Sequence, residues 1–182
     1  MLPKLQSQFD SLENLRKTLF NELENLDEKS LNFQPAPDSW SRLQVIHHLI
    51  IVEKGSLRYM RKKTRSFPSA KKLGIGSDIR SALFTISLRL PFRYKMPGKG
   101  LAPSEDDLSL SDLKQEWAEH RAEFEEFLGQ FTPETLRFAV FRHPAAGYFT
   151  ISQTLRFIEE HVNHHMKQLK RIHRKENSRK QN

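Results

Sequence analysis

Apolar residues recur every three or four positions along four stretches of the chain, the spacing of one face of an α-helix. The stretches cover residues 4–27, 41–65, 110–130 and 150–173. The stripe in the first consists of Leu5, Phe9, Leu12, Leu19, Leu23 and Leu26. Long amphipathic helices bury such stripes against one another, so the pattern predicts an all-α fold, an antiparallel four-helix bundle.

The connections between these helices contain the residues that break or cap helices. Pro35 and Pro37 separate the first two helices, and Asp38, Ser39 or Ser41 then caps the second. Thr150 or Ser152 caps the last helix.

A long insertion separates the second and third long helices. The apolar stretch 78–90 is interpreted as a shorter helix begun by Ser77, and residues 91–107 as a loop. Residues 137–150, RFAVFRHPAAGYFT, combine β-branched and aromatic residues with Pro and Gly, which favours an extended connection.

The length of 182 residues suits one domain, predicted over residues 1–173, followed by a basic, disordered tail over 174–182. The chain has no cysteine, which excludes disulfides, thiolate metal ligands and a cysteine nucleophile. Its first residues lack the pattern of a signal peptide, and no apolar run approaches the ~20 residues of a membrane span. The expectation is therefore a cytoplasmic protein with no membrane span.

The net charge of +8 is concentrated in two segments. Residues 54–104 carry 13 Lys and Arg against one acid, Asp78, and residues 166–182 carry seven against one, Glu176. This asymmetry is compatible with an anionic partner, such as nucleic acid or lipid, and equally with a solvated basic flank.

Four of the eight histidines lie between His161 and His173 in the last predicted helix. His161 and His165 are four residues apart, so their side chains are neighbours about 40° apart at the edge of the apolar arc. This spacing lets two imidazoles bind one ion, but it also occurs on ordinary surface helices. His164 points to another side of the helix.

A third ligand has to come from another helix. On the second helix His48 shares the side of Val45 and Val52, whereas His47 lies on the polar side. His120 lies on an apolar stripe, where a core histidine with a satisfied nitrogen is the simpler interpretation. His48, His161 and His165 are therefore the candidate ligands, and Glu53 is a candidate base or outer partner of the site.

Three histidines leave coordination positions open for water or substrate, which is typical of a catalytic rather than a structural metal site. Zn, Ni, Fe or Mn would accept this set. Such an ion polarises a substrate or lowers the pKa of a bound water or thiol.

Two segments resemble the DinB/YfiT-like superfamily. DSWSRLQVIHHLIIVE, residues 38–53, is similar to the start of that family's second helix, which delivers one histidine. HPAAGYFTISQTLRFIEEHVNHHMKQL, residues 143–169, is similar to the segment that leads through its last helix. The resemblance spans about residues 36–170.

The resemblance implies a four-helix bundle, often a homodimer, with a divalent metal held by His48, His161 and His165. It also implies transfer of a low-molecular-weight thiol, such as bacillithiol or mycothiol, or a related isomerisation. Some thiol transferases of the family have a further histidine five positions after the first ligand, where this chain has Glu53.

Three functions follow from these residues. The first is a metal-dependent transferase of a small-molecule thiol, with Arg58 or Arg93 receiving an anionic substrate. The second is a metal-dependent hydrolase with Glu53 as base. The third is a non-enzymatic binding protein that uses segment 54–104, ranked lower because the chain has no helix-turn-helix, zinc-finger or RNA-binding motif.

Overall fold

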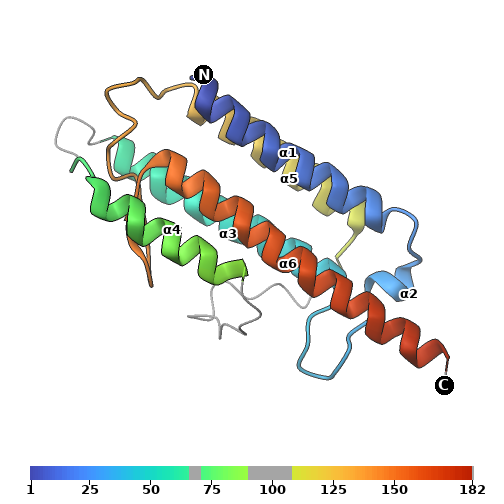
Figure 1. Cartoon of the computed structure of the whole chain (residues 1–182). Coiled ribbons are helices and arrows are strands. Elements are labelled where there is room, and N and C mark those ends of the chain that lie inside the picture. The colour runs from blue at the N-terminus through green and yellow to red at the C-terminus, as the bar shows by residue number, and fades with distance from the viewer. Residues whose placement is uncertain (66–70, 90–107, 182) are drawn as a thin grey trace.

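Four long helices form a bundle in the computed structural model, which describes residues 1–65, 71–89 and 108–181 (Figure 1). These are α1 (Pro3–Leu23), α3 (Arg42–Thr64), α5 (Leu110–Leu128) and α6 (Ile151–Lys180). The shorter elements are α2 (Glu28–Leu31), α4 (Ile75–Arg89) and a hairpin of β1 (Phe141–His143) and β2 (Gly147–Phe149). The predicted all-α four-helix bundle is confirmed.

The direction of the chain explains the position of the inserted helix. In Figure 1, α1 and α6 run in one direction and α3 and α5 in the opposite direction. Helix α3 packs against α5 and α6, and α1 packs against the same two helices. Two successive long helices, α3 and α5, therefore run parallel, because α4 carries the chain back along the outside of the bundle, where it packs on α6.

The helices that carry the candidate ligands begin at well-formed caps. The Ser41 side chain accepts a hydrogen bond from the backbone N–H of Gln44, and the Gln44 side chain accepts one from the Ser41 N–H. Thr150 and Gln153 repeat this capping box at the start of α6. Each box satisfies two backbone donors that a helix start leaves without partners, which fixes where the histidines fall on each helix.

The apolar stripes predicted from the sequence form the core. Leu5, Phe9 and Leu12 of α1 are at most 4% exposed, and Trp117 and Phe124 of α5 are fully buried. On α6 the residues of the stripe are likewise buried: Ile151, Leu155, Ile158, Val162, Leu169 and Ile172.

Helix α4 begins at Ile75, two residues before the cap predicted at Ser77, and ends at Arg89. Hydroxyl side chains of α4 face the bundle and aliphatic ones face outward, the reverse of the arrangement in the long helices. Ser77, Ser81 and Thr85 face inward, where each hydroxyl donates to a nearby backbone carbonyl. The aliphatic residues Ile75, Ile79, Leu83 and Ile86 are 52–76% exposed on the outer side. The end of the predicted helix, residue 90, and the predicted loop over 91–107 lie outside the described residues.

The segment before α6 is extended, as predicted, and its ends pair as a hairpin. Phe141 pairs with Phe149 and His143 with Gly147 in an antiparallel register. Gly147 has a φ of 75°, a conformation that glycine adopts without strain. The hairpin leads directly into the cap of α6.

The predicted disorder of the tail over 174–182 is wrong as far as Lys180, where α6 ends. Glu176 is buried, its Oε2 accepts a hydrogen bond from Arg42 at 2.8 Å, and its Oε1 accepts one from the Ser30 hydroxyl at 2.7 Å. These contacts fasten the end of α6 to α2 and α3. The basic composition of the tail suggested disorder because it gave no indication that its one acid, Glu176, pairs with the buried Arg42.

No helix within the described part of the chain combines the length and the apolar character that a membrane crossing needs.

Candidate metal centre

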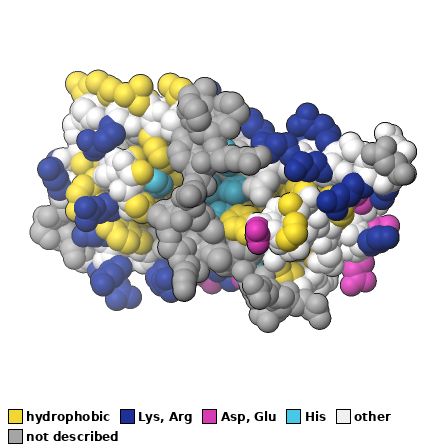
Figure 2. All heavy atoms as spheres, turned by 90° about the horizontal axis from the view of Figure 1, so that it is seen from below, with side chains coloured by type: hydrophobic (Ala, Val, Ile, Leu, Met, Phe, Trp, Pro, Cys, Tyr) yellow, Lys and Arg dark blue, Asp and Glu magenta, His cyan; other side chains and the backbone are white. Residues whose placement is uncertain are grey.

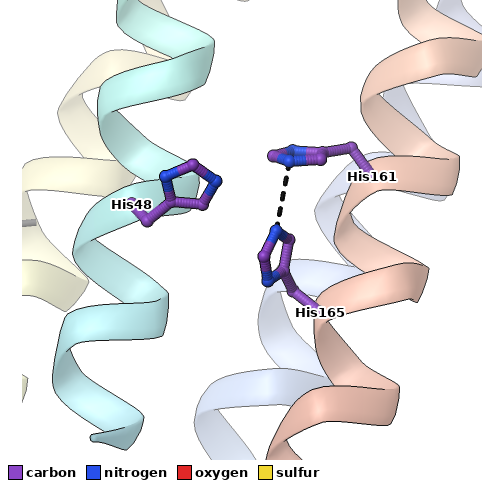
Figure 3. Close-up of side chains that lie close together, drawn as sticks. All are labelled: His48, His161 and His165. Atoms are coloured by element: carbon purple, nitrogen blue, oxygen red, sulfur yellow. Dashed lines mark hydrogen bonds between the residues drawn. The ribbon is translucent and has the colours of Figure 1, made fainter. Parts of the chain in front are cut away.

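Three histidines converge between α3 and α6. His48 of α3 points toward His161 and His165 of α6 in Figure 3, and each of the three offers a ring nitrogen within 4.8 Å of the other two. His48 is 3% exposed, His165 is 7% exposed, and His161 is partly buried. Helical periodicity selected this same set from the eight histidines of the sequence.

The spacing of the nitrogens suits a metal ion. Nε2 of His165 lies 3.2 Å from Nε2 of His161. Two nitrogens bound to one tetrahedral zinc at about 2.0–2.1 Å are about 3.3 Å apart. The two histidines of α6 therefore already have the separation of two ligands of one ion, and a nitrogen of His48 lies within 4.8 Å of both.

Gln168, one turn after His165, orients that ring. Nδ1 of His165 lies 2.8 Å from Oε1 of Gln168, an oxygen that only accepts hydrogen bonds. The proton of the neutral ring consequently resides on Nδ1, and Nε2 presents its lone pair to His161. Metal-binding histidines are commonly held in this way by an acceptor on the other ring nitrogen.

Aromatic rings enclose the three histidines. The Trp40 ring, in the segment before α3, lies 4.8 Å from the His48 ring and stacks at 6.4 Å on the His165 ring. On the other side, Phe157 stacks at 5.7 Å on the His161 ring. These neighbours restrict ring rotation and keep water from part of the site.

Burial and neighbouring histidines keep the imidazoles of His161 and His165 neutral. Burial, and after it the neighbouring His48, lower the pKa of His165 to about 3. Burial and the neighbouring His165 also hold the pKa of His161 well below its usual value. Neutral imidazole is the form that binds metal, so burial keeps the ring lone pairs available for an ion. Burying these polar rings costs desolvation free energy.

Glu53 is not gathered with the three histidines. Its buried carboxylate accepts hydrogen bonds from Nε1 of Trp117 at 3.1 Å and from Nη2 of Arg121 at 2.7 Å, both on α5. Burial raises the pKa of Glu53, and Arg121 opposes this change. The carboxylate proposed from the sequence as a base is thus engaged in linking α3 to α5.

The other candidate residues lie elsewhere. Arg58 is exposed and lines a groove between α3 and α5, and Arg93 lies outside the described residues. His120 is buried beside Glu53, at 3.8 Å. His164 lies on another side of α6, where its Nδ1 is 3.1 Å from the Leu88 carbonyl of α4.

Sequence reasoning missed Trp40, Phe157 and Gln168. The spacing between His165 and Gln168 was a usable signal, because residues three apart on a helix are neighbours. Trp40 lies outside a helix, so periodicity gave no information about it.

One face of the molecule carries many basic side chains. Figure 2 shows histidine side chains at the surface of this face, with Lys and Arg side chains on either side. A small anionic molecule approaching from this direction meets a favourable electrostatic field.

The fold and the sequence have relatives among known proteins. A solved structure, YfiT from Bacillus subtilis, described as a probable metal-dependent hydrolase with an unusual four-helix bundle topology, matches 94% of this chain and 87% of its own, with a TM-score of 0.61 and 18% identity. The uncharacterized protein YuaE of Bacillus subtilis (strain 168) is 25% identical over 164 residues, which are 88% of this chain and 93% of YuaE. A sequence model of the DinB superfamily matches residues 11–169. The chain therefore belongs to the DinB superfamily.

Proposed function

We propose that this protein is a metal-dependent enzyme whose divalent ion is bound by His48, His161 and His165. The convergence of three ring nitrogens within 4.8 Å supports this proposal most directly. Several imidazoles are costly to bury together, and a shared cation offsets that cost. The description of YfiT as a probable metal-dependent enzyme agrees with it.

The reaction that we propose is transfer of a low-molecular-weight thiol to an electrophile. A bound divalent ion would lower the pKa of a thiol toward neutrality. The sulfur then forms a bond to an electrophilic carbon, the leaving group departs with its electron pair, and the thiol proton passes to solvent. The three histidines would hold the ion that binds the sulfur, and the rings of Trp40 and Phe157 exclude competing water from part of the site.

The position of Glu53 favours thiol transfer over hydrolysis. Hydrolysis by an activated water is helped by a general base within hydrogen-bond reach. The carboxylate of Glu53 is instead bonded to Trp117 and Arg121. A thiol ionises at a much lower pH than water and has less need of a base. Hydrolysis remains the second candidate because of the description of YfiT.

A single assay separates the two reactions. Metal-loaded protein is supplied with an activated aryl or alkyl halide, and halide release is followed with and without a low-molecular-weight thiol. The proposal predicts release that requires both the thiol and an intact His161. Release that is equally fast without thiol would identify a hydrolase. Absence of release with any thiol or metal tested would contradict both reactions.

The homodimer and the cytoplasmic location remain predictions, and the identity of the metal among Zn, Ni, Fe and Mn is part of the same screen.

A further inference from the structure

A second candidate site lies between α3 and α5. A groove of about 570 Å³ is lined by Lys54, Leu57, Arg58, Arg61, Lys62, Arg65, His120 and Glu123. Its volume falls within the range of small-molecule sites, roughly 300–1,000 Å³. The three histidines of the candidate metal centre come from α3 and α6 and do not line this groove.

Two of the five cations in the groove are already paired with α5. Nζ of Lys54 lies 2.6 Å from a carboxylate oxygen of Glu116, and Nη1 of Arg61 lies 3.1 Å from one of Glu123. These two ion pairs connect the basic side of α3 to α5. Glu123 is the carboxylate that lines the groove, and its charge opposes the binding of a long polyanion such as nucleic acid.

The other three cations of the groove are not part of these two ion pairs. Arg58, Lys62 and Arg65 are exposed, and within the described part of the chain no carboxylate lies at ion-pair distance from them. They stand at positions i, i+4 and i+7, so they form one ridge about 10 Å long. Like charges at this spacing repel one another, and an anion that bridges them would relieve the repulsion.

The floor of the groove adds an independent observation. His120 is 3% exposed, and its Nε2, 3.8 Å from Oε2 of Glu53, has no hydrogen-bond partner among the described residues. Burial, and after it the cations Arg121, Lys54 and Arg61, together lower the pKa of His120 to about 4. The neutral ring therefore lies in a positive field, and it keeps hydrogen-bonding capacity that the described residues do not use.

We propose that this groove binds a small molecule carrying two or more phosphate or carboxylate groups, which Arg58, Lys62 and Arg65 hold above His120. Guanidinium groups suit both kinds of anion because they can donate two parallel hydrogen bonds to one group. The length of the ridge suits two or three linked anionic groups better than a single one.

Calorimetric titration of the full-length protein with inorganic tripolyphosphate tests this proposal at low and moderate salt. We expect one tripolyphosphate per chain, at least tenfold weaker binding in the double variant Arg58→Gln/Lys62→Gln, and a shift of the His120 imidazole signal in the NMR spectrum. The matched control is Lys17→Gln/Lys63→Gln, which removes the same charge from exposed lysines that do not line the groove.

Three results would overturn the proposal. They are no binding at low salt, an equal loss in the control variant, and tighter binding of a single-stranded oligonucleotide through the same residues. The variant His161→Ala separates this site from the proposed enzyme. Binding should survive that substitution, and its loss would show that the anion binds at the histidine centre instead.

Discussion

Gln168 accepts a hydrogen bond from Nδ1 of His165 at 2.8 Å, and this contact decides which nitrogen of His165 faces the neighbouring histidines. Both residues lie on α6, one turn apart, so the helix itself supplies the geometry. The acceptor leaves Nε2 of His165 with a lone pair, 3.2 Å from Nε2 of His161. The two nitrogens form a hydrogen bond in which Nε2 of His161 is then the donor, and a bound metal ion would take the place of that proton.

Replacement of Gln168 should therefore weaken metal binding. We expect Gln168→Leu to lower the affinity for a divalent ion about 10–100-fold, because the ring then loses its fixed tautomer and orientation. Competition with a chelator of known affinity measures the change. Gln168→Glu retains an acceptor and should keep most of the affinity, and equal affinities of the wild type and the Leu variant would refute the role of Gln168.

Stability of the metal-free protein should fall in mild acid. Burial lowers the pKa of His120 and of His143 to about 4, from 6.5 in an unfolded chain. Below pH 6.5 the unfolded chain takes up protons that the folded chain does not, so the free energy of unfolding decreases as the pH falls toward 4. Above pH 6.5 these two groups contribute no slope.

His143 offers a specific test of this dependence. Its Nδ1 accepts hydrogen bonds from the backbone N–H groups of Ala145 and Ala146, at 3.1 and 3.3 Å, and a protonated ring cannot accept them. The variant His143→Asn keeps an acceptor but does not titrate, so its unfolding free energy should depend less steeply on pH between 6.5 and 4. Urea unfolding at a series of pH values measures both slopes, and identical slopes would contradict the account.

The end of α6 should contribute strongly to stability. Arg42 and Glu176 form a buried ion pair at 2.8 Å, with side chains that are 2% and 7% exposed. Removing one partner leaves an uncompensated buried charge, so Glu176→Ala should cost about 3–5 kcal/mol of unfolding free energy. Ending the chain after residue 173 should cost at least as much.

A control separates the charge effect from lost packing. The double variant Arg42→Met/Glu176→Leu removes both charges, and it should recover much of the lost stability, since apolar replacements of a buried pair are often neutral. Chemical denaturation of the three variants measures the differences. A loss below about 1 kcal/mol in Glu176→Ala, the range of an exposed pair, would show that the pair is not structural.

Periodicity predicted most of the fold and the three histidines for a physical reason. Long helices place every third or fourth residue on one face, so the sequence alone assigns His48 and the pair His161 and His165 to inward faces. The capping residues Ser41 and Thr150 were also among those predicted, because backbone donors at a helix start need a nearby acceptor.

The failures have physical causes as well. The tail was predicted to be disordered from its composition, because a buried partner such as Arg42 for Glu176 is a long-range contact that local pattern does not reveal. Periodicity also did not reveal that Glu53 points to α5, since an apolar arc can face more than one neighbour. Trp40 reaches the site from a segment without periodicity.

Metal content per chain tests the central claim most directly. Elemental mass spectrometry would be applied to the purified wild type, to His48→Ala and His161→Ala, and to the controls His47→Ala and His164→Ala on the same two helices. We predict about one divalent ion per chain in the wild type and both controls, and loss of the ion in both ligand variants. No ion in the wild type after incubation with Zn, Ni, Fe and Mn, or equal content in all five proteins, would contradict a metal centre at His48, His161 and His165.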